Sequence, residues 1–540
     1  MNYHIFYSKG IRASLAILTI LGILLQTACT KNFAELNTNP NGITDSLLQL
    51  DYVGLGAFFP NMEKNIVIAA PNTGDGSVYQ IAQNLNADIF SGYMGTPTAF
   101  NGGQNNSNYK ITASWDNATF SVGFGTVMAA WYQVQTRAAQ AVPDYYAVAN
   151  ILKVEAMHRV TDVYGPLPYT RYGAGGFSVP YDSQDTIYNA FFSELDSAIA
   201  TLSAYVQQHP GATPLLDYDL VYGGKYTEWI KFANSLKLRL AMRIVYANPV
   251  LAQQKAEEAV SNSYGVMTTN SDNALVQSAN GITIHHPLYV IDFNYGDIRS
   301  GAVLQSFLTG YNDPRLTTYL LPSTAYPGVY LGVRNGIDII NKSDREGFSS
   351  VNIQDNTPIQ WMTAAEVYFL RAEGALRGWN MGGTAQSFYQ QGIQMSFTQR
   401  GVGSATSYMA DNTSTAAPYT DPVNGVNNVP AGSPALSTVT IAWNAADNFE
   451  TSLERIITQK YLAMFPEGEE AWAEFRRTGY PKIWPVVVNY SGGTISTQVE
   501  IRRLPFPQSE YQNDATTVQQ GVTLLGGPDL GGTKLWWDQK

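Results

Sequence analysis

Apolar residues recur every three or four positions in several segments of the chain, the spacing that places them on one face of a helix. Four of these stripes begin at Ala149, Ile187, Trp229 and Trp361. Each stripe predicts a helix with one buried face, and Phe191 lies within the second. Breaker residues agree with the pattern, because the third stripe ends before Asn248-Pro249 and the fourth ends near Gly378.

Together with their neighbours, the stripes predict helix-turn-helix pairs at 126–142 with 145–164, 185–206 with 226–247, 361–378 with 384–400, and 452–465 with 468–478. Such pairs are similar to tetratricopeptide repeats, although their spacing is not the uniform 34 residues or so of that repeat. Long turn-rich segments separate them, at 66–120, 265–360 and 401–450. Long loops are uncommon in compact proteins unless they are functional, so we expect helices to form the scaffold and loops the binding surface.

The sequence also indicates where two helices end. Gly165-Pro166 cannot continue a helix, so the segment from Asp162 to Tyr164 is predicted to be a last helical turn. Glu469 and Glu470 come early in the segment 468–478, and Arg476 and Arg477 close it. This order of charges suits a helix dipole, which favours a capping role over a catalytic pair of carboxylates.

The N-terminus has the pattern of a bacterial lipoprotein signal. Lys9 and Arg12 precede an apolar run from Leu15 to Leu25, and the small residues Thr27-Ala28 come directly before Cys29. A membrane-spanning helix needs about 20 apolar residues, more than this run contains. We therefore predict cleavage before Cys29 and acylation of its thiol, with an ordinary secretory signal or a spanning anchor as the alternatives.

Composition narrows the possible partners. Cys29 is the single cysteine, so no disulfide can support the fold. Charged residues make up 14% of the chain and aromatic residues 12%, and the charged share is below the usual value of about 25%. The net charge of −11 argues against binding to nucleic acid. The predicted organisation is a signal peptide at 1–28, a lipidated tether at 29–50 and a single domain at 51–540.

Catalytic patterns are absent from the sequence. Beyond the predicted signal, histidine occurs at positions 158, 209, 285 and 286, without the H-E-x-x-H spacing of a zinc site. Gly224-Lys225 resembles the end of a phosphate loop, but Asp219 stands where its first glycine belongs. Neither a metal, a cofactor nor a catalytic residue is predicted. Because a glycoside hydrolase needs only two suitably spaced carboxylates, that class stays an alternative.

Residues suited to binding sugars lie in two loop segments. A sugar ring has apolar faces and hydroxyl edges, so its site needs aromatic platforms beside amide, carboxylate or guanidinium groups. The candidate ligand-binding residues are Tyr93, Phe100, Asn101, Tyr289, Asp292, Asn294, Tyr295 and Arg299.

Several motifs together resemble one family. They are Cys29-Thr-Lys-Asn-Phe33 through Asn37-Thr-Asn-Pro-Asn-Gly42, Ala156-Met-His-Arg-Val-Thr-Asp-Val-Tyr-Gly-Pro-Leu-Pro-Tyr169, Asn312-Asp-Pro-Arg315, Ala364-Ala-Glu-Val-Tyr-Phe-Leu-Arg-Ala-Glu373, Glu454-Arg-Ile-Ile-Thr-Gln-Lys-Tyr-Leu-Ala463 and Arg502-Arg-Leu-Pro-Phe-Pro507. In this order they resemble the SusD/RagB family of nutrient-binding outer-membrane lipoproteins.

The resemblance implies a mainly α fold, in which four tetratricopeptide-like helix pairs pack against a loop-rich half with little β structure. It further implies a non-enzymatic protein, anchored to the outer membrane and facing the cell exterior, that captures a nutrient for a SusC-like TonB-dependent transporter. An oligosaccharide is the expected ligand. A peptide ligand, or a role as a protein-interaction scaffold, are the alternatives.

Overall fold

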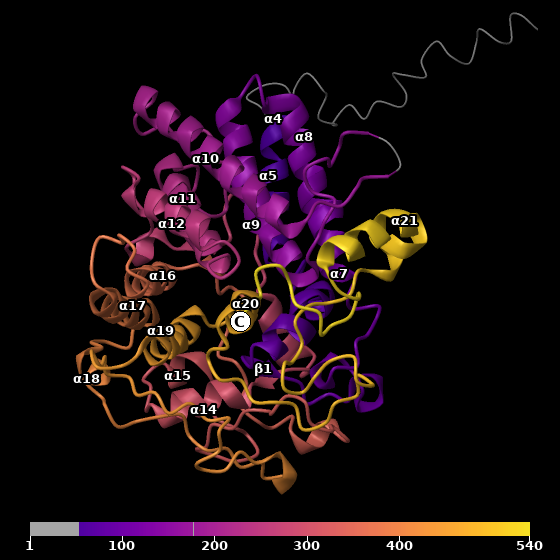
Figure 1. Cartoon of the computed structure of the whole chain (residues 1–540), viewed down its shortest axis with the longest axis vertical. Helices are drawn as coiled ribbons and strands as arrows, with labels where there is room; N and C mark the ends of the chain where they lie inside the picture. Colours follow the sequence, from indigo (N-terminus) through magenta and orange to yellow (C-terminus); the bar gives the residue numbers. More distant parts are fainter. Residues whose placement is uncertain (1–52, 176–177) are drawn as a thin grey trace, which may run out of the picture. The chain divides into compact units, whose positions relative to one another are not determined.

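Helices dominate residues 53–175 and 178–540, the part of the chain described by the computed structural model (Figure 1). The predicted signal peptide, the tether and Cys29 lie outside these residues. Within them, residues 55–540 make up one unit.

The α-helices are α4 (Val53–Gly56), α5 (Phe58–Ile66), α6 (Ser77–Tyr79), α7 (Ala118–Val122), α8 (Ala129–Ala138), α9 (Pro143–Tyr164), α10 (Gln184–Gln208), α11 (Tyr226–Arg243), α12 (Pro249–Ser261), α13 (Pro287–Tyr289), α14 (Ala302–Gly310), α15 (Leu316–Tyr319), α16 (Ala364–Leu376), α17 (Ala385–Arg400), α18 (Thr406–Met409), α19 (Phe449–Met464), α20 (Gly468–Thr478) and α21 (Gln508–Leu525). The π-helical segments are η2 (Gln80–Asp88), η5 (Gly123–Met128) and η7 (Val290–Asn294). Short 3₁₀ turns form η3 (Phe100–Gly103), η4 (Asn106–Asn108), η6 (Asn270–Asp272), η8 (Lys342–Asp344) and η9 (Gly425–Asn427).

The predicted helix pairs are present, with η5 and α8 together covering most of the first segment. The sequence prediction missed α12 and α21. The buried residues of α12 are Ala252, Ala256 and Ala259, whose small side chains leave only a weak apolar stripe. Its start does follow the usual rules, because Pro249 opens the helix and the Asn248 side chain accepts a hydrogen bond from the Leu251 amide at 3.2 Å.

Successive helices pack side by side along the chain. Each of α8 to α11 contacts the next helix, and α16 packs against α11, α17 and α19 (Figure 1). The last predicted pair behaves differently, since α20 packs chiefly against η2 rather than α19. The approach is close at Gly468, where an added Cβ would lie 2.2 Å from Oδ1 of Asp88. A glycine is therefore required at this contact.

The core formed by these helices is aromatic. Trp229 is fully buried and meets Tyr222 edge to face, with ring centroids 5.2 Å apart. Phe191 of α10 is also fully buried, 5.1 Å from the ring of Tyr169. Both residues belong to stripes predicted from the sequence, so the apolar periodicity identified the core-facing sides of α10 and α11.

The sheets are small and connect distant loops. Strand β1 (Met94–Gly95) pairs antiparallel with β3 (Arg299–Ser300), with Gly95 opposite Arg299. Strand β2 (Ala274–Val276) pairs antiparallel with β4 (Ile359–Met362). The described residues are thus mainly helical with little β structure, as expected.

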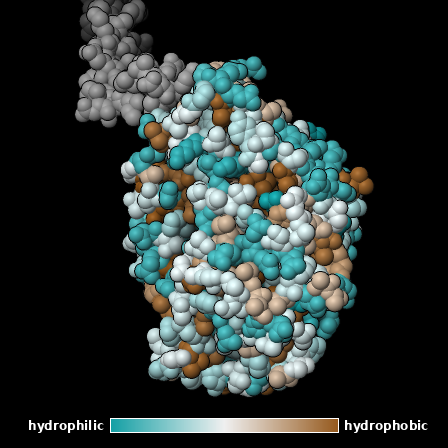
Figure 2. Space-filling view, turned by 90° about the vertical axis from the view of Figure 1, so that its left-hand side faces the viewer, coloured by the Kyte–Doolittle hydropathy of each residue, from teal (hydrophilic) through white to brown (hydrophobic). Residues whose placement is uncertain are grey.

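Figure 2 shows one face, on which small groups of hydrophobic residues are scattered among hydrophilic ones. Within 53–175 and 178–540, no helix combines the length and apolar character needed to cross a bilayer.

Candidate functional site

The structure brings together the two loop segments that were predicted to bind ligand. The pairing of β1 with β3 places residues 94–95 beside residues 299–300. Just beyond, the Thr98 hydroxyl donates to Oδ1 of Asp297 at 2.7 Å, which ties the loop carrying η3 to the segment that follows η7. Segments about 200 residues apart in sequence thus form one region.

A third loop, at residues 72–76, joins this region through two of the predicted residues. The Tyr295 hydroxyl donates to the Gly74 carbonyl at 3.0 Å and accepts from the Gly76 amide at 2.9 Å. The side-chain amide of exposed Asn294 donates to the Thr73 carbonyl. Both residues therefore hold the region together, while the Tyr295 ring stays partly exposed.

Tyr93 is a core residue, which corrects its prediction as a ligand platform. Its side chain is 0% exposed, its ring lies 4.4 Å from that of Tyr461, and its hydroxyl donates to the Tyr461 carbonyl. A ring buried on all sides has no face for a sugar. The residue packs the loop after η2 against α19.

Asp292 and Arg299 form an ion pair within the protein, which we call the clamp. Asp292 is buried, so its predicted role in direct ligand contact is wrong, whereas Arg299 is partly exposed. Nη1 of Arg299 lies 2.7 Å from Oδ1 of Asp292, and Nε donates to the Glu346 carbonyl at 2.7 Å. Asp292, which is 2% exposed, also accepts from the Val351 amide at 2.7 Å. Burial raises the pKa of Asp292 to about 6, although Arg299 opposes this shift. The clamp fixes η7 and β3.

The remaining predicted residues keep accessible surface. Tyr289 lies beside Phe293, with ring centroids 5.1 Å apart and the planes inclined by 34°. Phe293, which the sequence prediction missed, is 42% exposed. Its position four residues after Tyr289, one helical turn away, was the signal that could have identified the pair.

Phe100 and Asn101 present a second aromatic and amide pair. Phe100 is partly exposed and meets Trp115 edge to face at 5.6 Å. Asn101 is exposed at a left-handed φ of 54°, and its amide donates to the Thr112 hydroxyl at 3.0 Å. Asparagine tolerates this conformation better than most residues.

Charged and amide groups that sequence reasoning missed join the segment 289–299 to other parts of the chain. Asp297 accepts from Nε2 of Gln80 at 3.0 Å and from Nζ of Lys342 at 2.9 Å. Lys342 also donates to the Tyr295 carbonyl at 2.7 Å. Because these partners come from η2 and η8, the local sequence around residues 289–299 contained no sign of them.

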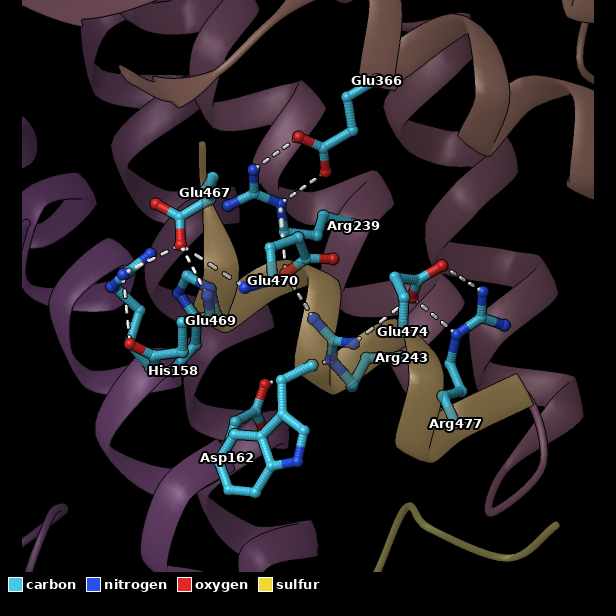
Figure 3. Close-up of polar contacts among 12 residues, drawn as sticks. His158, Asp162, Arg239, Arg243, Glu366, Glu467, Glu469, Glu470, Glu474 and Arg477 are labelled. Carbon is cyan, nitrogen blue, oxygen red and sulfur yellow. Dashed lines mark hydrogen bonds and ion pairs between the residues drawn. The ribbon is translucent and has the colours of Figure 1, made fainter. Parts of the chain in front are cut away.

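A large group of ionisable side chains is buried among the helices. Figure 3 shows Arg239 beside Glu366 and Glu470, and Arg243 beside Asp162, Glu470 and Glu474. The Arg239–Glu366 contact is 2.7 Å, and both side chains are almost completely buried. We call the following residues the buried charge network: Glu155, Arg159, Asp162, Arg239, Arg243, Glu366, Glu373, Lys460, Glu467, Glu469, Glu470, Glu474 and Arg477.

The network bears on the predicted role of helix α20. Gly479 ends α20 at a φ of 78°, and the Glu467 side chain accepts from the Glu469 amide at 3.1 Å, so the helix is capped at both ends. Yet Glu469 and Arg477 are buried. Long-range ion pairing thus adds to the helix-dipole role that was predicted.

Burial and charge shift the pKa values of the network and of neighbouring His158. Although burial opposes it, Arg477 and Lys460 hold the pKa of Glu474 below its ordinary value. Burial raises the pKa of Glu155 to about 8, but this side chain is 0% exposed. Burial and nearby arginines hold the pKa of His158 well below its usual range. No group of three or more potential metal ligands with a suitable arrangement occurs within the described residues.

Comparisons with known proteins identify the family. The model of the SusD-like family, described as SusD and RagB outer membrane lipoproteins, matches residues 35–538. No curated protein matches the chain.

Several solved structures of other proteins match the fold of this chain over most of its length. A chitin-binding SusD homolog from Flavobacterium johnsoniae is 45% identical, with 90% of this chain and 98% of that chain covered and a TM-score of 0.86. A SusD homolog from Bacteroides vulgatus is 35% identical, with 91% and 98% covered and a TM-score of 0.85. Another, from Bacteroides uniformis, is 38% identical, with 90% and 99% covered and a TM-score of 0.81. The chain therefore belongs to the SusD-like family of outer membrane lipoproteins.

Proposed function

We propose that this lipoprotein captures an oligosaccharide at the cell surface without cleaving it and delivers it to a SusC-like TonB-dependent transporter. The observation that carries the proposal is the ring pair of Tyr289 and Phe293, which is accessible and lies on the same segment as Asn294 and Asp297. Aromatic faces match the apolar faces of sugar rings, and amide and carboxylate groups match their hydroxyls. The chitin-binding relative supports a chitin oligosaccharide as the first ligand to test.

The surrounding structure supports a pre-formed site. The Asp292–Arg299 clamp fixes the start and end of the segment, and Tyr295 joins it to residues 72–76. A rigid loop loses less conformational entropy when it binds, so more of the contact energy is available for affinity. Tyr93 and the Asp292–Arg299 clamp thus support the loops. Contacts with the ligand come from Phe100, Asn101, Tyr289, Phe293 and Tyr295.

Phe293→Ala is expected to weaken binding of a chitin hexasaccharide about 5- to 150-fold, the loss of about 1–3 kcal/mol typical of an aromatic anchor. Isothermal titration calorimetry on the purified mature protein measures it. Phe449→Ala is the matched control, because Phe449 is 37% exposed and lies on helix α19.

Unchanged affinity in both Phe293→Ala and Tyr289→Ala would rule out the ring pair as the site. Binding of a peptide but no glycan across an array would replace the oligosaccharide with the peptide alternative. New reducing ends after incubation with the hexasaccharide would show hydrolysis and contradict the non-catalytic part of the proposal.

The anchor is tested at Cys29. Cys29→Ala removes the thiol that lipid would occupy, so we expect the protein to move from the membrane fraction to the soluble fraction with an unchanged circular dichroism spectrum. An alkaline carbonate wash separates an anchored protein from an adsorbed one. Retention of the variant in washed membranes would show that Cys29 is not the anchor.

A further inference from the structure

A cavity lies where α21 runs beside α7, and none of its lining residues belongs to the loops of the candidate site (Figure 1). Its volume is about 260 Å³. Ser509 of α21 donates to the Asn117 side chain at 2.9 Å, which holds the two elements together at this point. The cavity is lined by Phe120, Phe124, Pro168, Tyr172, Val179, Tyr181, Glu510, Asn513, Asp514, Thr517 and Val518.

The walls are aromatic and held in place. Phe120 and Phe124 are 4.6 Å apart, and Phe124 is 6.0 Å from Tyr172. Tyr181, which also lines the cavity, packs edge to face on Phe506, with ring centroids 5.4 Å apart. Phe120 and Tyr181 are both buried, so packing in the core fixes their orientation. Rings of this kind carry negative charge on their faces.

Two carboxylates line the same cavity, and no basic residue does. The nearest partner of Glu510 is the Tyr181 hydroxyl, 3.4 Å from Oε2. Asp514 accepts from the Thr517 amide at 3.1 Å. Among the described residues, neither carboxylate forms an ion pair with lysine or arginine. Burial raises the pKa of Glu510, as expected for a carboxylate without a nearby cation.

We propose that this cavity binds a small organic cation, with an ammonium or quaternary-ammonium group over the rings of Phe124 and Tyr172 and its charge toward Glu510 and Asp514. Aromatic faces attract such groups, and aromatic cages for quaternary ammonium ions work in this way. The two carboxylates supply the charge complement that an uncharged sugar does not need. The proposal does not depend on the oligosaccharide site, which uses other loops.

Choline and its uncharged isostere 3,3-dimethylbutan-1-ol test the charge requirement, because they share shape but not charge. By ligand-observed NMR titration of the mature protein, we expect choline to bind at least tenfold more tightly than the alcohol. Glu510→Gln is expected to lower choline affinity at least fivefold, and Phe124→Leu to do the same through the lost ring. Asp217→Asn, at an exposed carboxylate outside the cavity, serves as control and is expected to leave affinity unchanged.

Thermal unfolding of each variant shows whether it is folded, and the near-isosteric Glu510→Gln keeps the test valid should Phe124→Leu be unstable. Equal affinity for choline and the alcohol, or no detectable choline binding, would overturn the proposal. Unchanged choline affinity in folded Glu510→Gln would also overturn it, because the carboxylate would then have no part in recognition.

Discussion

Arg477→Met is expected to lower the free energy of unfolding by about 3–5 kcal/mol, the usual loss when a buried ion pair loses one partner. Arg477 is completely buried and contacts both oxygens of Glu373, at 2.7 and 2.6 Å. It also contacts both oxygens of Glu474, at 2.8 and 2.7 Å. Methionine fills much of the volume but leaves the two carboxylates with less compensating charge. Urea unfolding followed by circular dichroism measures the change.

Two further variants sharpen this test. Lys540→Ala breaks the ion pair with half-exposed Glu450, where about 0–1 kcal/mol is expected. The double variant Arg477→Met, Glu373→Leu removes one of the two carboxylates that lose Arg477 as a partner and is expected to recover part of the loss. A loss below about 1 kcal/mol for Arg477→Met would mean that the buried charge network is not a stabilising unit.

Phe191→Ala, on helix α10, is also expected to cost about 3–5 kcal/mol, for a different reason. The ring is fully buried between Tyr169, at 5.1 Å, and Tyr188, at 5.5 Å. Truncation removes apolar contact and leaves a cavity that two large neighbours cannot readily fill. The same urea titration measures the loss, while affinity for the oligosaccharide is expected to stay unchanged because α10 packs chiefly on α9 and α11.

Val250→Ala is the control for shortening an apolar side chain on a helix, since Val250 is 78% exposed on α12. Its expected effect is within about 0.5 kcal/mol. A similar loss in both variants would contradict the assignment of Phe191 to the core and of Val250 to the surface.

Local patterns in the sequence were sufficient for the long helices. The stripes of large apolar residues in α9, α10, α11 and α16 predicted both the helices and their buried faces. The last turn of α9 was predicted too, because Gly165, at a φ of 91°, leaves the helical conformation and Pro166 directly after it cannot continue the helix. Apolar periodicity and helix-breaking residues act over a few neighbouring positions, so they can be recognised from the sequence alone.

The candidate site shows what local sequence patterns could not predict, which is the exposure and pairing of its side chains. Tyr93 and Tyr295 are the same residue type in similar turn-rich segments, yet Tyr93 is buried against Tyr461 and Tyr295 is partly exposed. Asp292 and Arg299 looked like free polar groups and are paired with each other. Exposure depends on which distant segment packs on a loop, and the pairing of β1 with β3 joins positions about 200 residues apart.

The family motifs show the same division between sequence and structure. Their linear order was enough to indicate the family and its mainly helical fold. Only the tertiary structure showed that Asp162, Glu366 and Lys460, from three of those motifs, belong to one buried charge network. The other members of this network come from α9, α11, α16 and α20, and from Glu467 directly before α20. The sequence by itself determined helices, caps and family, because these depend on neighbouring residues. Folding decided burial, ion pairing and accessible rings, because these depend on contacts between segments far apart in the chain.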